Sequence, residues 1–129
     1  MKQYTTPEQT AKLIELGFEK PKSVTEISWQ EDEKDNPIIN ANTIEYTRNY
    51  SIGELIETLP MTITHEIWFG KDKGKEGVWG LQISTGGTEY VWEISYERAY
   101  SAHLYCEARS ELIDALYDMI VKLKEEGVI

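Results

Sequence analysis

The chain has 129 residues, of which 40% are hydrophobic and 28% are charged. This length and composition are typical of a folded soluble protein that buries a core without disulfides or a metal, so we predict a single globular domain over residues 1–129. The net charge of −10 opposes direct binding to nucleic acid, because phosphate contacts need clustered Lys and Arg.

The sequence predicts neither a membrane-spanning segment nor a secretory signal. No run of apolar residues approaches the roughly 18 that a membrane span needs, and the first residues lack the apolar core of a signal peptide. The single cysteine, Cys106, cannot form an internal bridge. We therefore expect a cytoplasmic protein without a membrane partner.

The first predicted element is a helix that ends at Gly17. Thr6 and Gln9 fit a capping box, and Pro7 suits the first helical position. A glycine after the last apolar residue is a common helix stop.

Residues 20–60 predict two strands and a short helix. The strands are expected within 23–29 and 42–50, separated by a charged turn at 30–37. A second capping box begins at Ser51 and opens a helix that Pro60 ends.

Three strands are expected next, at 61–69, 78–84 and 89–97, with a tight Gly-Gly hairpin between the last two. They form an antiparallel meander with one charged face and one apolar face. Alternation places these residues on the apolar face: Met61, Ile63, Ile67, Phe69, Trp79, Leu81, Ile83, Tyr90, Trp92, Ile94 and Tyr96. The segment 98–109 fits either a fourth strand or an early helical turn.

The last helix is expected from Ser110 to Glu126, with Ser110 as its cap and Gly127 as its stop. Its apolar stripe has helical spacing and consists of Leu112, Leu116, Met119, Ile120 and Leu123. The predicted fold is therefore α+β, an antiparallel sheet of three to five strands with the N-terminal and C-terminal helices packed on one face.

Two tryptophans are expected in the core and one outside it. Trp79 and Trp92 share strand faces with aliphatic residues, which indicates packing rather than ligand binding. Trp68 falls in phase with Glu66 on the polar face, which makes it the better candidate for an exposed contact; the same position also fits a side chain covered by a helix or by a partner chain. His65 is in phase with the apolar residues and is expected to lean into the core or its rim. Trp68, Glu66 and His65 are the candidate binding residues.

No catalytic or metal site is predicted. His103, Cys106 and Glu107 would share a face on a helix, whereas on a regular strand His103 and Cys106 would point to opposite sides. A structural zinc would also need His65 as a fourth ligand. The stretch at 70–77, GKDKGKEG, lacks the spacing of a phosphate-binding loop and reads as a solvated hairpin. We expect no cofactor and no metal.

Three segments resemble short uncharacterised proteins encoded in phages and mobile elements of gut bacteria. They are YTTPEQTAKLIELG at 4–17, YSIGELIETLP at 50–60 and ELIDALYDMIVKLKEEG at 111–127. The resemblance covers about a third of the chain, mostly helices. It implies an accessory role in a bacterial or phage cytoplasmic setting, and it assigns no site residue.

Three functional hypotheses follow from the sequence. The first is a non-enzymatic accessory or protein-interaction module, with a possible homodimer through the polar sheet face near Trp68. The second is an acidic inhibitor that imitates DNA, which requires carboxylates arrayed on one face. The third is a small hydrolase, which requires His65, Glu66 or the pair His103 and Cys106 to converge in one pocket.

Overall fold

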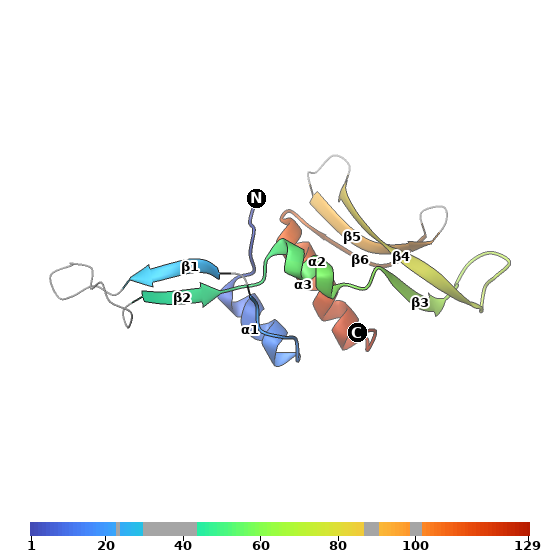
Figure 1. Ribbon diagram of the computed structural model, residues 1–129. Coiled ribbons are helices and arrows are strands. Elements are labelled where there is room, and N and C mark those ends of the chain that lie inside the picture. Colours follow the sequence, from blue (N-terminus) through green and yellow to red (C-terminus); the bar gives the residue numbers. More distant parts are fainter. Residues whose placement is uncertain (23, 30–43, 87–90, 99–101) are drawn as a thin grey trace. The chain divides into compact units, whose positions relative to one another are not determined.

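The computed structural model describes residues 1–22, 24–29, 44–86, 91–98 and 102–129 (Figure 1). The chain divides into two compact units. One is Tyr4–Ser51, and the other joins Met1–Gln3 to Ile52–Ile129. Each unit is described by itself, so the single domain stays a prediction. The charged turn at 30–37 and the Gly-Gly turn at 86–87 fall wholly or partly outside the described residues.

The unit Tyr4–Ser51 begins with helix α1 (Pro7–Glu15). Thr6 accepts a hydrogen bond from the backbone N–H of Gln9, and the Gln9 side chain accepts one from the backbone of Thr6. The predicted capping box is therefore confirmed. Gly17 follows the helix with a φ of 98°, a left-handed conformation that glycine adopts without steric cost.

The same unit contains a two-stranded antiparallel ribbon of β1 (Val24–Trp29) and β2 (Ile44–Arg48), which confirms both predicted strands. The ends of the unit are tied together by the backbone N–H of Thr5, which donates to the Tyr50 carbonyl at 2.9 Å. The buried hydroxyl of Thr10 bonds the Thr5 hydroxyl at 2.7 Å and Asn49 Oδ1 at 2.5 Å. These hydrogen bonds join the start of the unit, helix α1 and the end of the unit.

The unit Ile52–Ile129 contains α2 (Ile52–Thr58), β3 (Thr62–Glu66), β4 (Glu76–Gly86), β5 (Val91–Arg98), β6 (Ala102–Arg109) and α3 (Leu112–Glu125). The four strands form one antiparallel sheet in the order β3-β4-β5-β6. This arrangement confirms the α+β class and the antiparallel sheet. It also settles the segment 98–109, most of which is strand β6.

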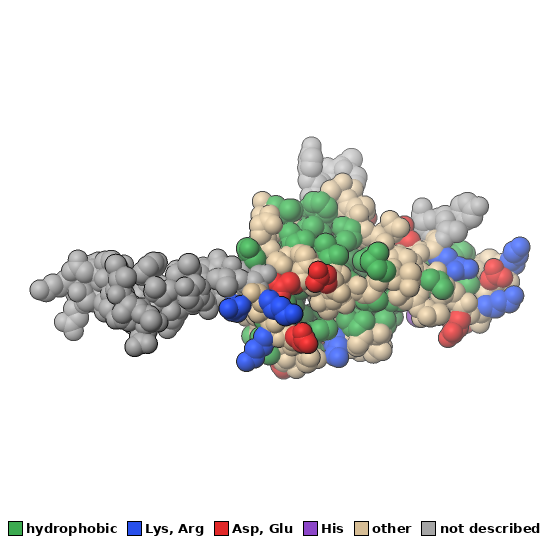
Figure 2. Space-filling view, viewed as in Figure 1, with side chains coloured by type: hydrophobic (Ala, Val, Ile, Leu, Met, Phe, Trp, Pro, Cys, Tyr) green, Lys and Arg blue, Asp and Glu red, His purple; other side chains and the backbone are tan. Residues whose placement is uncertain are grey.

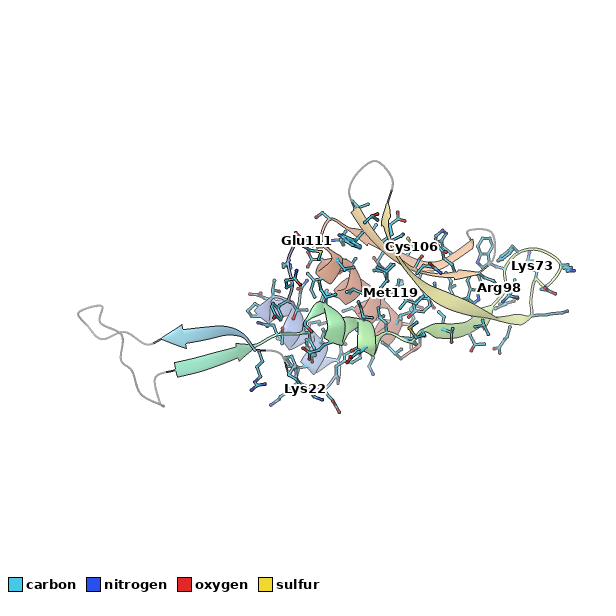
Figure 3. The ribbon with its side chains drawn as sticks, turned by 45° about the horizontal axis from the view of Figure 1, so that its top comes forward. Lys22, Lys73, Arg98, Cys106, Glu111 and Met119 are labelled. Carbon is cyan, nitrogen blue, oxygen red and sulfur yellow. The ribbon has the colours of Figure 1, made fainter. Side chains whose placement is uncertain are left out.

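Helix α3 packs its apolar stripe on β5 and β6 and also contacts α2. Figure 3 labels Met119 on this helix, whose side chain has no exposed surface. The helix and sheet residues without exposed surface are Trp79, Ile94, Tyr96, Ile113, Ala115, Leu116, Met119, Ile120 and Leu123. Burial of each large apolar side chain contributes about 1.5–3 kcal/mol. This core holds α3 on the four-stranded sheet.

Two predictions about element ends are wrong. Ser110 does not cap α3, since the N-cap is Glu111, which makes no side-chain cap bond. The Glu111 carboxylate instead accepts a bond from the Lys2 backbone N–H at 2.9 Å, and Lys2 Nζ lies 2.8 Å from Asp114. Met61 is 72% exposed rather than inward, because it precedes the first residue of β3.

Tyr96 joins the core to the start of β3. Its side chain is fully buried, and its hydroxyl donates a hydrogen bond to the Pro60 carbonyl at 2.7 Å. Burial raises the pKa of Tyr96 from 10.0 to about 12. The bond fixes the position of the backbone two residues before β3 begins.

Replacing Tyr96 by Phe is expected to lower the free energy of unfolding at neutral pH by about 1 kcal/mol, the usual net value of one hydrogen bond. In the parent protein the folded state keeps a proton that the unfolded state loses above pH 10, so stability falls between pH 10 and 12. Urea unfolding across that range should show a shallower decline for Tyr96→Phe. Equal declines would contradict the assigned pKa.

Candidate functional site: the open edge of the sheet

Strand β3 is an edge strand of the four-stranded sheet. The Leu81 N–H donates to the Met61 carbonyl at 2.9 Å, and the Ile67 N–H donates to the Lys75 carbonyl at 2.8 Å. These two hydrogen bonds lie just before and just after β3. Because backbone groups alternate in direction along a strand, the odd-numbered residues of β3 direct their N–H and C=O groups toward β4. Three residues direct their N–H and C=O groups away from β4, to the side where no described strand pairs with them: Thr62, Thr64 and Glu66.

A groove of about 460 Å³ lies along this edge. One wall is formed by Pro60 and the first residues of β3, and the other by Gly127–Ile129, which follow α3. The Val128 N–H donates to the Leu123 carbonyl at 2.9 Å, so the second wall is tied to the helix. Neighbouring strands lie about 4.8 Å apart. An extended segment that pairs with β3 would therefore enter this groove.

Trp68 lies just past the end of β3 and is 54% exposed. Its ring makes an edge contact with Phe69, with centroids 5.0 Å apart, and Phe69 makes a similar contact with Trp79 at 6.2 Å. Of the alternatives that the sequence left open, Trp68 is therefore exposed rather than covered by a helix of its own unit, and its binding role stays a prediction. A large apolar ring held from behind by the core is typical of a protein contact.

His65 is half-buried beside β4 rather than deep in the core. Its Nδ1 lies 3.1 Å from the Glu66 carbonyl, and its ring meets Tyr105 of β6 edge-on at 6.2 Å. Glu66 is exposed and pairs in register with Glu76. His65 and Glu66 therefore point to opposite faces of the sheet, as neighbours on a strand do.

The two other tryptophans differ in burial. Trp79 has no exposed surface, and its indole N–H donates to the His65 carbonyl at 3.3 Å. This confirms its place in the core. Trp92 is only partly buried, because it lies near the β4–β5 end of its strand. Of the two, Trp79 holds β3 and β4 together at their centre.

A bulge in β6 changes which side chains share a face. Cys106 pairs with Ser95 and His103 with Glu97, with one extra residue, Tyr105, on the β6 side. Tyr105 has a φ of 55°, a left-handed conformation that costs an ordinary residue about 1–2 kcal/mol. His103 and Cys106 consequently lie on one face, whereas a regular strand would place them on opposite faces.

Glu107 does not join the pair, because it opposes Ile94 on the face covered by α3. His103 Nδ1 lies 3.3 Å from Glu97 Oε1. Burial and the charge of Asp118 raise the pKa of Glu107 on balance, although the charges of Lys122 and Arg109 lower it. In the described part of the chain, no three His, Cys, Asp or Glu side chains gather as a metal site would require.

The Cys106 thiol is exposed but lies among carboxylates. Burial of the sulfur and the charges of Glu93, Glu107 and Glu97, in that order, raise the pKa of Cys106 above 9.0. A thiol activated as a nucleophile has the opposite shift. Cys106 therefore lacks the electrostatic surroundings of a catalytic cysteine.

The β3–β4 hairpin is the basic part of this surface. Figure 2 shows basic side chains interspersed with acidic ones at its end, and Figure 3 labels Lys73 there. Lys71, Lys73 and Lys75 are exposed, and Lys75 lies 3.6 Å from Asp72. In a chain with a net charge of −10, this hairpin gives the end of the edge a locally positive charge.

Sequence reasoning found Trp68 but missed the groove. Its second wall comes from Gly127–Ile129, more than sixty positions beyond β3, and no local pattern signals that proximity. The edge position of β3 was also unassigned, although the polar residues Thr62 and Thr64 are consistent with it. The bulge had no signal, since a left-handed residue is most often glycine and here is tyrosine.

Comparisons with known proteins give no family for this chain. No family model matches it, and neither a curated protein nor a solved structure matches it. Among the described residues, no helix has the length and apolar character needed to cross a bilayer.

Folded Cys106 should react with iodoacetamide more slowly than a free thiol at the same pH, because its raised pKa leaves less thiolate. Glu93→Gln removes a neighbouring negative charge and should speed the reaction. Glu76→Gln is the matched control and should leave the rate unchanged. Mass spectrometry of timed samples measures all three rates. A folded protein that alkylates faster than a free thiol would contradict the assigned surroundings.

Proposed function

We propose that this chain is a non-enzymatic protein-interaction module that binds an extended protein segment along β3. The observation that carries the proposal is the outer edge of β3, with which no described strand pairs, beside a groove of about 460 Å³. Backbone groups at such an edge supply affinity to an added strand, while flanking side chains supply specificity. Trp68 would be the main side-chain contact.

The distribution of reactive groups favours binding over catalysis. His65 points to the α3 side of the sheet, whereas Glu66, His103 and Cys106 belong to the other side. General acid–base chemistry needs its groups within hydrogen-bond reach of one substrate. The raised pKa of Cys106 further disfavours a nucleophilic role.

We place the module in the cytoplasm of a bacterium, as an accessory protein of a phage or mobile element. The basis is the resemblance of its helical segments to proteins encoded by such elements. An accessory module of this kind would act by occupying or linking other proteins.

DNA mimicry is a second candidate, favoured by Glu66, Glu76, Glu93 and Glu97 on the face of the sheet opposite α3. Such a mimic would need its carboxylates to follow a row of phosphates without interruption. His103 forms an ion pair with Glu97, and the lysines of the β3–β4 hairpin border the same face. This mixture of signs favours the interaction module.

Capture from a bacterial lysate tests the proposed function when the edge is varied. We expect the parent protein to retain a partner that Thr64→Pro and Trp68→Ala lose. Proline at Thr64 removes an outward N–H without breaking a bond to β4, as edge strands tolerate. Crosslinking mass spectrometry should place the partner's contacts on β3.

Thr64→Val and Trp68→Phe are the matched controls, since they keep the edge N–H and an aromatic ring. Both should retain the partner. A partner that binds Thr64→Pro as strongly as the parent protein would show that β3 is not the binding element, and the proposed function would then fail.

A further inference from the structure

We infer that the four-stranded sheet carries a binding site for a phosphate group beside the β3–β4 hairpin, centred on the guanidinium of Arg98. Each strand of the sheet contributes one residue to this site: His65 of β3, Gly77 of β4, Arg98 of β5 and Tyr105 of β6. The inference goes beyond the proposed function and does not depend on it, since the outward backbone groups of β3 take no part in the site.

Gly77 gives the Arg98 side chain room to lie against the sheet. A Cβ atom at Gly77 would stand 2.9 Å from Arg98 Nη1 and 2.7 Å from two side-chain carbons of Ile67. Both distances are shorter than the 3.5–4.0 Å or so at which non-bonded carbon atoms pack. The guanidinium therefore uses the space that any larger residue at position 77 would fill, and it lies on the face toward which that side chain would point.

Arg98 keeps most of its hydrogen-bond donors available to a ligand. Its Nη1 donates to the Val78 carbonyl at 3.2 Å. A guanidinium has five N–H donors in a planar fork, so four remain. Among the described residues the ion pairs involve other side chains, and none includes Arg98, although the chain has 23 acidic and 13 basic residues. A guanidinium with free donors of this geometry binds oxyanions through two parallel hydrogen bonds.

His65 lies beside the guanidinium on the same face. It is the register partner of Gly77. Directly opposed residues on one face of a sheet have Cβ atoms about 4.5–5.5 Å apart. Since Arg98 Nη1 lies 2.9 Å from the Cβ position of Gly77, it is at most about 8.4 Å from His65 Cβ. One oxyanion between them can therefore contact both side chains.

The orientation of His65 leaves one ring nitrogen for a ligand. Its Nδ1 lies 3.1 Å from the Glu66 carbonyl, so Nε2 is the remaining nitrogen. The Tyr105 ring meets the imidazole edge-on, with centroids 6.2 Å apart, and supports it from the β6 side. An anion nearby favours the imidazolium form, in which both nitrogens donate.

The carboxylates of these strands lie on the other face of the sheet. Glu66 and Glu76 are register partners there, and Glu97 forms its ion pair with a histidine on that face. Figure 3 labels Arg98 and Lys73 at the same end of the larger unit, where the hairpin carries its exposed lysines. The site therefore presents positive charge to a ligand in a protein whose net charge is −10.

A phosphate group suits this arrangement better than a carboxylate. A carboxylate has two oxygens, and the guanidinium fork of Arg98 engages both. The phosphate of a monoester has three acceptor oxygens and a charge of about −1.5 to −2 at neutral pH, so one oxygen remains for His65. The ligand class is therefore inorganic phosphate or a small phosphomonoester, which share this chemistry.

An NMR titration of the whole chain with inorganic phosphate, at constant pH and ionic strength, tests the inference. We expect saturable shifts of the Gly77 amide and of the His65 ring signals at millimolar phosphate. O-phosphoserine should reproduce them if the site takes the ester, and saturation by inorganic phosphate alone would support a site for the free ion. Acetate at the same concentration should cause no comparable shift. Shifts that fail to saturate at tens of millimolar phosphate would overturn the inference, as would equal shifts with acetate.

Variants of the site supply the second measurement. Arg98→Gln should abolish saturable binding, and Arg98→Lys should weaken it about tenfold, because an ammonium lacks the planar fork. Gly77→Ala should also weaken binding, since its methyl group displaces the guanidinium. If Gly77→Ala does not fold, the two Arg98 variants decide. Phosphate affinity unchanged in Arg98→Gln would overturn the inference.

Two control variants separate a built site from general attraction to positive charge. Arg48 also donates one hydrogen bond to a backbone carbonyl, that of Lys22 at 2.8 Å, so Arg48→Gln should leave phosphate affinity unchanged. Lys73→Gln removes a positive charge at the same end of the sheet without touching the site, and it should weaken binding far less than Arg98→Gln. Equal losses in Lys73→Gln and Arg98→Gln would overturn the inference.

Discussion

The packing of α3 on β5 and β6 is the contact on which the larger unit depends. Seven residues of this helix are buried, and five of them have large side chains with no exposed surface. Because side chains alternate along a strand, covering one face fixes the register of β5 and β6, and β4 follows through its ladder. One helix cannot cover four strands. Helix α3 therefore packs on the β6 side of the sheet, and β3 is the last described strand on the other side.

The bulge at Tyr105 lies where edge strand β6 approaches the other edge strand, β3. The strand order places β3 and β6 at opposite edges, yet the rings of His65 and Tyr105 meet at 6.2 Å. The sheet must curl for this contact to form, and bulges increase the local twist of the strand that contains them. Figure 1 shows the curl in the larger unit. The curl brings β3 and β6 close to each other near His65. Within the described residues it adds no backbone hydrogen bond to Thr62 or Thr64.

The sequence predicted those features that depend on local periodicity. The capping box at Thr6, strands β1 to β5 and the apolar stripe of α3 follow from spacing alone, and all are found, whereas the segment that forms β6 fitted a strand or a helical turn equally. The phase of Trp68 with Glu66 made it the candidate for an exposed ring, and the ring is exposed. These patterns are short-range, so tertiary packing had little room to override them.

Features that depend on distant residues were not predictable in this way. Ser110 fits a cap by residue type, but the N-cap is Glu111, whose carboxylate accepts a hydrogen bond from the backbone N–H of Lys2, far away in sequence. Met61 fits the alternation of β3 but lies outside the strand. The groove needs Val128 beside Thr64, and the shared face of His103 and Cys106 needs the bulge. Each is set by where other segments pack.

In the part of the chain that the structure describes, no strand pairs with the outward backbone groups of β3, and we expect these groups to be unpaired in a single copy of the protein. Residue-resolved hydrogen exchange of the dilute protein tests this most directly, by comparing the amides of Thr64 and His65. Thr64 should exchange rapidly and His65 slowly, since only His65 faces β4. If the Thr64 amide is protected as strongly as that of His65 at the lowest concentration, the edge is already covered and the account is wrong.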